Sequence, residues 1–396
     1  MKYKIIFLLI LGLDVLNLVF QTSQISISFR ESLILYGEIT PLKILVKSSM
    51  LIFGHNDFAL RIPMIFIHVL SVILMFSISK HYIKDYSNRL WLITIFILLP
   101  GVLSSGLVVD KAGLIILGLL LFIWLYLNSY KKTYYSLLIF FAFLDNSYIY
   151  LFLALSIYAI YIKNRDFFIF NMLAFFISVF LYGVEAHGIP KGHFLDILAL
   201  YAAIFSPIIF IYIVFILYRR HLDSKHDVIW FISTVTLMVS LTLSFRQNIK
   251  IEHFAPYIII ALPIAAQSFI SSYRVRLKQF RKIYRVIFQI SLILLIINTI
   301  TVIFNKELYL FVENPKKHFV YKFHIAKELA KELKDNGITC IDTNYKMQSR
   351  LHFYGVTKCD KYILKRYSSN TKKDTDVTIS YKNRPIYKAN VTKLNK

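Results

Sequence analysis

The chain has 396 residues, of which 57% are hydrophobic and only 17% charged, and its mean hydropathy is +0.59. Soluble globular chains carry about a quarter charged residues, and apolar runs of spanning length recur along the first three quarters here, so we expect a polytopic α-helical membrane protein. The runs are continuous rather than alternating, which argues against a transmembrane β-barrel. The formal net charge of +24 is not a nucleic-acid footprint, because much of it falls in short loops where Lys and Arg set membrane topology.

The first apolar run covers residues 3–20 and follows Lys2 and Lys4. We expect an uncleaved first span with a cytoplasmic N-terminus, because the bulky residues after it make a poor signal-peptide cleavage site. A long polar first outer loop, residues 21–59, then leads to a second span at 60–79. Within that loop, residues 41–53 have an apolar face interrupted by Lys43 and Lys47, which is typical of a helix lying in the membrane interface.

Nine further spans are expected after the second. They lie at 90–109, 112–130, 134–144, 147–162, 167–183, 197–218, 228–245, 257–272 and 286–304. The stretch 134–162 is divided at residues 144–147, because Asp145 at mid-bilayer would be costly. With eleven spans, nearly all Lys- and Arg-rich loops lie on the cytoplasmic side, as the positive-inside rule predicts. We therefore expect a protein of the bacterial inner membrane whose C-terminus is in the periplasm. Residues 1–304 thus form a transmembrane domain.

Residues 305–366 are expected to form a small periplasmic α/β domain, with a helix at 324–335, a strand at 338–343 and a second apolar element at 350–356. Residues 367–396 are polar and basic, which is typical of a partly disordered tail. The two cysteines, Cys340 and Cys359, either form a disulfide in an oxidising outer compartment or remain two independent thiols.

The predicted outer face gathers carboxylates and cations. They are Glu31, Glu38 and Asp57 of the first loop, Asp110 and Lys111, Asp145, then Glu185, His187, Lys191, His193 and Asp196, and finally Arg246, Lys250, Glu252 and His253. Such a set suits a reaction between a lipid-linked phosphate and a polar acceptor, in which cations hold the phosphate and a carboxylate takes a proton from the attacking hydroxyl or amine. The sequence has no His/Cys cluster with metal-ligand spacing, so no metal is assigned, although a divalent ion is compatible with the reaction.

Residues Phe53 to Pro63 follow the pattern F-G-x-x-x-F-x-x-R-x-P. This segment resembles the signature that opens the second span in glycosyltransferase family 39 and the ArnT-like group, which are GT-C fold enzymes related to the protein O-mannosyltransferases. Further matches in the same order are Glu31, then Pro100 with Asp110, and the element Phe353-Tyr354-Gly355. The resemblance implies an inverting transfer of a sugar from a polyprenyl-phosphate carrier to an envelope glycolipid or protein acceptor on the periplasmic face, without a nucleotide sugar.

One departure from the family affects the choice of the base. The family usually has an Asp-Glu pair in the first loop, whereas this chain has Arg30-Glu31. The base is then Glu31, or Asp57 or Glu38, or the chain has lost activity.

We take Glu31 and Asp110 as the candidate catalytic residues. The candidate substrate-binding residues are Arg246, Lys250 and Lys191 for the carrier phosphate, with Arg30, Asp57, Arg61 and His253. Simpler structural interpretations stay open for several of them: an Asp57–Arg61 pair that anchors the second span, Asp110 as a helix cap, and Arg246 and Lys250 in contact with lipid head groups.

Two other function classes compete with the enzyme. A transporter or flippase of a lipid-linked intermediate usually shows internal repeats and broken helices at mid-bilayer, and the sequence shows no such repeat. An inactive GT-C scaffold is favoured by the missing Asp beside Glu31.

Overall fold

A computed structural model describes residues 2–183, 192–224, 226–366 and 375–393. Lys191, Glu185 and His187 lie outside the described residues. The described chain divides into two compact units. The first unit comprises residues 1–16 and 64–299, and the second comprises residues 17–63 and 300–396.

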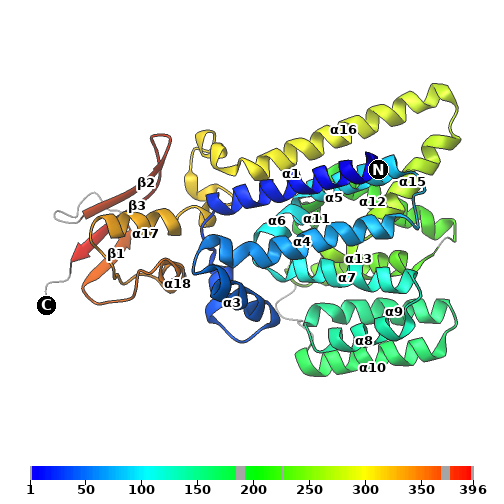
Figure 1. Ribbon diagram of the computed structural model, residues 1–396, viewed down its shortest axis with the longest axis horizontal. Coiled ribbons are helices and arrows are strands. Elements are labelled where there is room, and N and C mark those ends of the chain that lie inside the picture. The colour runs from blue at the N-terminus through cyan, green and yellow to red at the C-terminus, as the bar shows by residue number, and fades with distance from the viewer. Residues whose placement is uncertain (1, 184–191, 225, 367–374, 394–396) are drawn as a thin grey trace. The chain divides into compact units, whose positions relative to one another are not determined.

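The first unit is helical. Three of its helices, α1, α4 and α16, include residues of the second unit. Its elements are α1 (Lys2–Gln24), α4 (Asp57–Ser79), α5 (Tyr86–Leu98), α6 (Pro100–Leu107), α7 (Lys111–Leu127), α8 (Lys131–Ala142), η1 (Asn146–Tyr148), α9 (Ile149–Tyr161), α10 (Arg165–Tyr182), α11 (Phe194–Phe205), α12 (Pro207–Leu222), α13 (Val228–Ser244), η2 (Ile251–His253), α14 (Ala255–Ile259), α15 (Leu262–Val275) and α16 (Lys278–Ile303). Helix α9 packs against both α10 and α13 (Figure 1). Large side chains such as Phe96, Phe122 and Phe152 are fully buried in the core of the first unit.

Each of the eleven apolar segments expected from the sequence is a helix or a pair of helices. Among the described residues, five helices are long and apolar enough to cross a membrane, and seven spans result if each of two bent pairs is one span. The three shorter apolar helices, Lys111–Leu127, Asn146–Tyr161 and Val228–Ser244, fall on three further expected spans. The protein is therefore helical with several helices suited to a membrane, and the count of eleven stays a prediction.

Two expected spans are bent rather than straight. Helices α5 and α6 meet at 63° and helices α11 and α12 at 106°. Pro100 and Pro207 stand at the start of the second helix of each pair. Proline lacks the N–H and clashes with the preceding turn, so it fits the first turn of a helix and not its interior.

The break predicted at residues 144–147 is confirmed. Helix α8 ends at Ala142, and the short turn η1 begins at Asn146. Asp145 caps this turn, because its Oδ1 accepts hydrogen bonds from the backbone N–H of Ser147 at 3.0 Å and from its hydroxyl at 2.6 Å.

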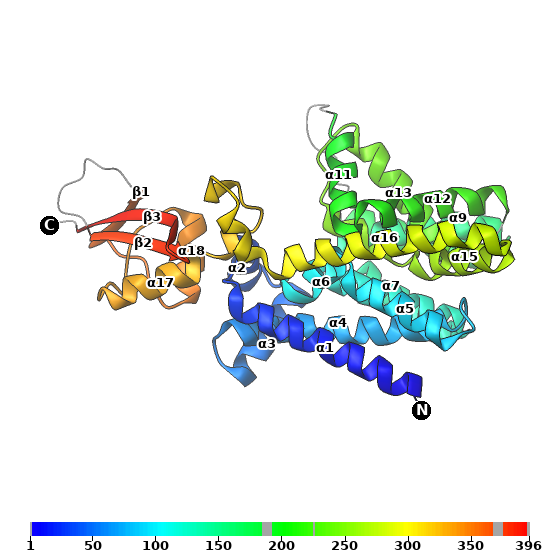
Figure 2. The ribbon, with the colours of Figure 1, turned by 90° about the horizontal axis from the view of Figure 1, so that it is seen from above.

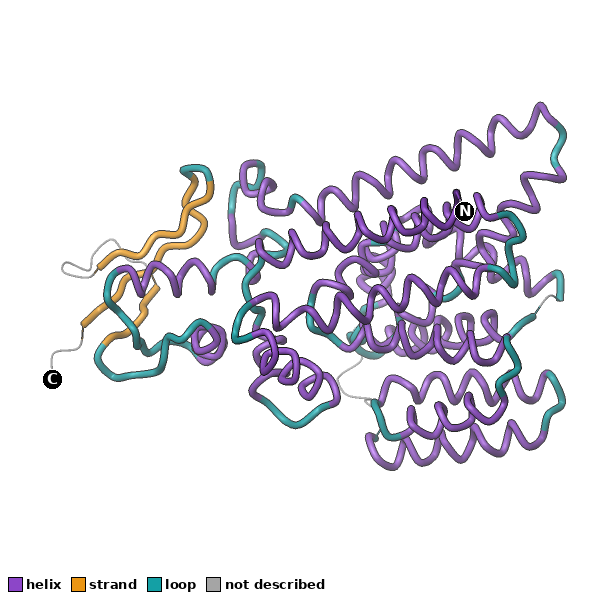
Figure 3. Tube along the Cα trace, viewed as in Figure 1, coloured by secondary structure: helices purple, strands orange, loops and turns teal. Residues whose placement is uncertain are grey.

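The second unit combines helices with a small sheet. Its own elements are α2 (Phe29–Tyr36), α3 (Pro41–Phe53), η3 (Asn305–Leu310), η4 (Pro315–Lys317), η5 (Tyr321–Phe323), α17 (Ala326–Asp335), α18 (Tyr345–Phe353), β1 (Tyr362–Arg366), β2 (Thr375–Tyr381) and β3 (Arg384–Lys393). The strands are antiparallel in the order β1-β3-β2 and lie in the C-terminal part of the chain (Figure 3). Helix α17 packs on this sheet (Figure 2). It does so through Ala326, Leu329, Ala330 and Leu333, an i, i+3, i+4, i+7 stripe that is buried.

The sequence-based expectations for this region are partly wrong. The helix expected at 324–335 is confirmed as α17, but residues 338–343 form only two isolated bridges, from Cys340 to Thr357 and from Asp342 to Ile363. The second apolar element is the end of helix α18. Residues 375–393 of the expected tail form a β-hairpin, whose two-residue turn has positive φ at Lys382 (47°) and Asn383 (67°). Such a turn matches the twist of the paired strands.

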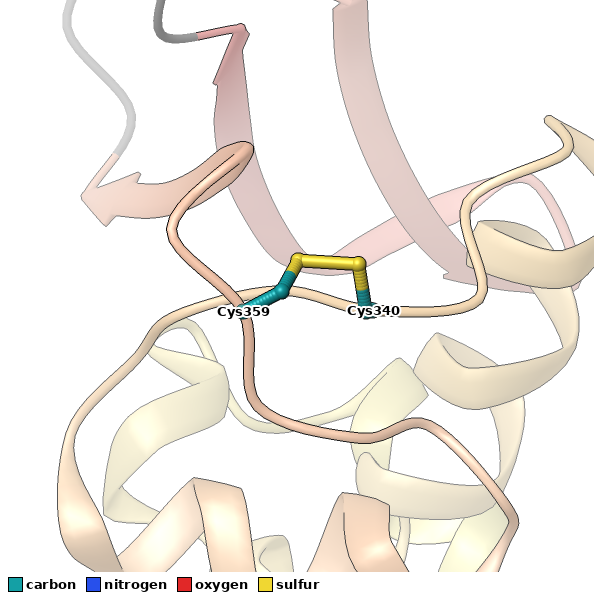
Figure 4. The surroundings of a disulfide bond; sticks show 2 residues. All are labelled: Cys340 and Cys359. Carbon is teal, nitrogen blue, oxygen red and sulfur yellow. A yellow bond between two sulfur atoms is a disulfide. The ribbon is translucent and has the colours of Figure 1, made fainter.

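The disulfide alternative for Cys340 and Cys359 is confirmed (Figure 4). Their Cα atoms are 5.4 Å apart, and 19 positions separate them in sequence.

Replacing both cysteines by alanine should lower the free energy of unfolding of the second unit by about 3 kcal/mol, since a cross-link over a loop of this length restricts the unfolded chain by about that amount. Thermal unfolding of the double variant in detergent, beside the wild-type protein with and without reductant, checks this. A reduced wild-type protein that melts like the oxidised one would contradict it.

Candidate functional site

Arg61 holds together the N-terminal part of the second unit. It is fully buried. Its guanidinium donates to the backbone carbonyl oxygens of Ile25 at 3.2 Å and Ser26 at 3.0 Å. Nη2 also lies 3.2 Å from Oε2 of Glu31, and Nη1 lies 3.8 Å from Oδ1 of Asp57. The pairing of Arg61 with Asp57 expected from the sequence is present, but Glu31 is the closer partner.

Glu31 is fixed by its own helix as well as by Arg61. Ser28 and Glu31 form a capping box at the start of α2: Ser28 Oγ accepts from the N–H of Glu31 at 3.2 Å, and Glu31 Oε2 accepts from the N–H of Ser28 at 2.7 Å. Glu31 is 0% exposed, and its Oε2 is used twice. These contacts show that Glu31 has a structural use, and its catalytic role stays a prediction. Asp57, the alternative base within the same loop, has a different environment.

Asp57 is the first residue of helix α4, and its side chain contacts residues from both segments of the second unit. Its Oδ1 accepts from the hydroxyl of Tyr354 at 2.8 Å, and its Oδ2 lies 2.9 Å from Nζ of Lys327. The Tyr354 hydroxyl in turn accepts from the N–H of Ile27 at 2.9 Å. Burial and the neighbouring Asp57 carboxylate raise the pKa of Tyr354, so its hydroxyl stays a hydrogen-bond donor.

An open hollow of about 750 Å³ borders this carboxylate. Its lining comes from the loop before α4, from α17 and from the end of α18, and includes His55, Asp57, Lys327, His352 and Tyr354. The side chain of Lys327 is 41% exposed whereas that of Asp57 is 7% exposed, and Nζ of Lys327 also donates to the carbonyl oxygen of Ser23 at 3.3 Å, so a ligand in the hollow can reach Lys327 more easily than Asp57. A nearly buried carboxylate beside a partly exposed cation suits proton transfer next to an anionic group.

A second polar group lies in the first unit, where η1 and η2 approach the start of α7. Lys111 Nζ is 2.6 Å from Asp145 Oδ2, and the Ser147 hydroxyl is 2.7 Å from Nδ1 of His253. The hydroxyl of Tyr257 donates to the carbonyl oxygen of Ser147 at 2.7 Å. Thus Lys111, Asp145 and His253, expected together on the outer face, do lie together.

A smaller hollow of about 140 Å³ adjoins this network. His253, Lys250, Gln247, Asn248 and Asn146 contribute its polar lining. The predicted phosphate-binding residue Lys250 therefore borders a hollow.

The other predicted residues have simpler positions. Asp110 caps α7 by accepting from the N–H of Lys111 at 2.6 Å, as its structural alternative expected. Arg30 and Arg246 are exposed. Glu31, the candidate catalytic residue, and Arg246, a candidate phosphate-binding residue, belong to different units. Lys191 lies outside the described residues.

Sequence reasoning missed three polar residues. Lys327 has the spacing of a surface lysine on an amphipathic helix, and nothing local indicates its contact with Asp57. Asp14 and His68 form a buried pair, with His68 Nε2 2.7 Å from Asp14 Oδ2. Both lie inside expected spans, and an ionisable residue there is itself a signal that could have found them.

No protein-family model matches this chain, and no curated protein is similar to it in sequence. Among the residues that the structure describes, no group of three or more His, Cys, Asp or Glu side chains is arranged to hold a metal ion. The family resemblance of Phe53–Pro63 therefore stays a prediction that rests on those residues.

Proposed function

We propose that this protein is a GT-C type glycosyltransferase of the bacterial inner membrane, with eleven spans and a periplasmic C-terminal domain. It moves a sugar from a polyprenyl-phosphate carrier to an envelope glycolipid or protein. The observation that carries the proposal is the placement of Asp57 in the second unit: a nearly buried carboxylate at an open hollow, in contact with the exposed cation Lys327 and the hydroxyl of Tyr354.

The proposed chemistry is one inverting displacement. An acceptor hydroxyl attacks the anomeric carbon, the bond from that carbon to the phosphate oxygen breaks, and the polyprenyl phosphate leaves. Asp57 takes the hydroxyl proton, and Lys327 turns from Asp57 to the leaving phosphate, where its charge stabilises the oxygen that gains electrons. Tyr354 keeps the carboxylate in place through its 2.8 Å hydrogen bond.

The apolar part of the lining of this hollow also suits a sugar ligand. Phe353 and Tyr36 border it together with the polar groups. Their rings pack against His55 and His352, with centroid distances of 4.6 Å for His55 with Phe353 and 5.0 Å for Tyr36 with His352. Ligand sites commonly combine aromatic walls with a few placed polar groups.

The test uses membrane vesicles that contain the full-length protein and a labelled polyprenyl-phosphate sugar pool, with product followed by mass spectrometry of glycolipids and glycoproteins. Asp57→Asn should reduce transfer by roughly 10²–10⁴-fold, the usual contribution of a positioned acid or base. Glu332→Gln, on an exposed position of α17, is the matched control and should transfer at the wild-type rate.

Two results would overturn the proposal. One is transfer at the wild-type rate by Asp57→Asn. The other is an unchanged set of envelope glycolipids and glycoproteins in cells that lack the gene. A loss confined to Glu38→Gln would give the base to Glu38 instead.

The inactive scaffold remains a second candidate because of one specific observation. Both acidic residues near the family signature are engaged with cations, Glu31 with Arg61 and Asp57 with Lys327. If the protein is an inactive scaffold, Asp57→Asn leaves the envelope glycans unchanged, whereas Arg61 variants reduce the amount of folded protein.

A further inference from the structure

The smaller hollow of the first unit has properties that the proposed reaction does not use. Its volume of about 140 Å³ would hold about five waters at roughly 30 Å³ each, or one sugar ring. It is bordered by the start of α9, the residues after α13 and the turn η2.

The hydrogen bonds behind the hollow have a defined direction. The ionised Asp145 carboxylate only accepts hydrogen bonds, and it lies 2.6 Å from Nζ of Lys111 and 2.6 Å from the Ser147 hydroxyl. Ser147 must therefore donate its proton to Asp145. Its oxygen is left to accept from Nδ1–H of His253, 2.7 Å away.

This direction fixes the tautomer of His253. With the proton on Nδ1, the neutral imidazole has an unprotonated Nε2, which is an acceptor. The ring borders the hollow, and no described residue forms a hydrogen bond to Nε2. Burial lowers the pKa of His253, with Asp145 and Glu252 acting to raise it and Lys111 and Lys250 acting to lower it, so the neutral form prevails at pH 7.

Asn146 also lines this hollow, and its Oδ1 becomes a second acceptor there when its side-chain amide turns toward the hollow. Its Oδ1 is buried and has no hydrogen-bond partner among the described residues. A buried acceptor without a partner costs free energy until a donor reaches it. Two acceptors at one small hollow call for a ligand with several hydroxyl donors.

We propose that this hollow binds one sugar ring, whose hydroxyl groups donate to Nε2 of His253 and Oδ1 of Asn146, and that Ser147 and Asp145 are positioning residues that fix the His253 tautomer. The choice of a sugar among polyols rests on the proposed function. The ring comes either from the lipid-linked donor or from the acceptor glycan. Lys250, at the same hollow, distinguishes the two sources because it would pair with a donor phosphate.

Binding to the full-length protein in nanodiscs tests the proposal without requiring transfer. The probes are methyl hexosides, a short prenyl phosphate that carries the same hexose, and the bare prenyl phosphate. His253→Phe and Asn146→Leu should each weaken hexose binding about five- to tenfold, as expected for one lost hydrogen bond at a buried acceptor. His81→Phe, at an exposed histidine of the same unit, should bind like the wild type.

The hydrogen-bonded chain from Asp145 through Ser147 to His253 can be observed directly. Nitrogen NMR of labelled histidine should show His253 as the Nδ1–H tautomer in the wild type and in Ser147→Thr, and as a tautomer mixture with weaker hexose binding in Ser147→Ala. Ser147→Ala also serves if a larger substitution fails to fold. A donor source gives tighter binding of the sugar-bearing prenyl phosphate than of the methyl hexoside, and Lys250→Ala removes that difference. An acceptor source gives equal binding of the two.

The proposal is overturned if no hexose probe binds saturably, or if hexose binding is the same in wild type, His253→Phe and Asn146→Leu. Saturable, His253-dependent binding in a protein without transferase activity would refute the proposed function and leave the sugar site standing. Sugar transfer together with hexose binding that does not depend on His253 would refute the sugar site and leave the proposed function standing.

Discussion

Replacing Arg61 by leucine is expected to lower the free energy of unfolding of the second unit by about 3–5 kcal/mol, the usual cost of removing one partner of a buried ion pair. Glu31 is 0% exposed and would keep a buried charge without its cation. The carbonyl oxygens of Ile25 and Ser26 would lose their donors as well. Thermal unfolding of the purified protein in detergent and limited proteolysis of the second unit measure the loss.

Lys47→Leu is the matched control, because it also removes a cation from the first loop but at an exposed position of α3. Its effect should stay within about 0.5 kcal/mol. An equal loss in both variants would show that the charge of the loop, and not the buried pair, determines stability.

A double-mutant cycle isolates the contact between the two side chains. Glu31→Leu and Arg61→Leu together should cost less than the sum of the single losses, by about 1–3 kcal/mol, because the double variant leaves no buried charge without a partner. Strict additivity would mean that Arg61 stabilises the unit through its backbone contacts alone.

This cluster shows where sequence reasoning stops. Arg61 and Asp57 are one helical turn apart, so their pairing could be predicted. Glu31 is thirty positions from Arg61, and their contact depends on how α1, α2 and α4 meet. The capping box could have been found, because Ser28-x-x-Glu31 is its local signature, and it would have predicted a structural role for Glu31.

Local rules performed well elsewhere in the chain. The cost of a carboxylate at mid-bilayer predicted the break at Asp145, and the preference of Asp for helix starts gave the cap of α7 as the structural alternative to the predicted catalytic role of Asp110. The hairpin at 375–393 was missed although Val377 and Ile379 alternate with polar residues and Asn383 suits a left-handed turn position. Polar composition was given more weight there than the period of two.

The candidate sites were predicted in type but not in geometry. Grouping charges by membrane face anticipated that Lys111, Asp145 and His253 share one place. It could not order them into a relay, because Ser147 looks like an ordinary turn residue until its hydroxyl is seen between Asp145 and His253. Lys327 is 270 positions from Asp57 (327 minus 57), and one sequence offers no signal for that contact.

Acidification from pH 7 to pH 5 should destabilise the second unit, with His324 as the main cause. His324 is 5% exposed, and its Nδ1 is 3.0 Å from the hydroxyl of Tyr309. Burial, with the nearby Lys306 and His318, lowers the pKa of His324 to about 3. Burial also lowers the pKa of His318, which donates from Nε2 to the carbonyl oxygen of Asn305 and accepts at Nδ1 from the backbone N–H of Val320.

The sign follows from the comparison with the unfolded chain, where histidine has a pKa near 6.5. Below that pH the unfolded state binds a proton that folded His324 does not take up, so stability is fully present above about pH 6.5 and declines as the pH falls toward 3. One such group costs about 2 kcal/mol by pH 5. Lys382 and Tyr381 lower the pKa of Glu307, so its contribution is lost only below the ordinary range of a carboxylate.

Denaturant unfolding at pH 7 and pH 5 in the same detergent measures this loss. His324→Gln cannot become charged and keeps an amide near Tyr309, so it should remove most of the pH dependence. His352→Gln, at an exposed histidine of α18, should keep the wild-type dependence. The interval from pH 7 to pH 5 separates the effect of the histidine from that of the carboxylates. Most carboxylates take up a proton only below pH 5, whereas the histidine of the unfolded chain takes one up below about pH 6.5. An equal decline in wild type and His324→Gln would assign the acid sensitivity to groups other than this histidine.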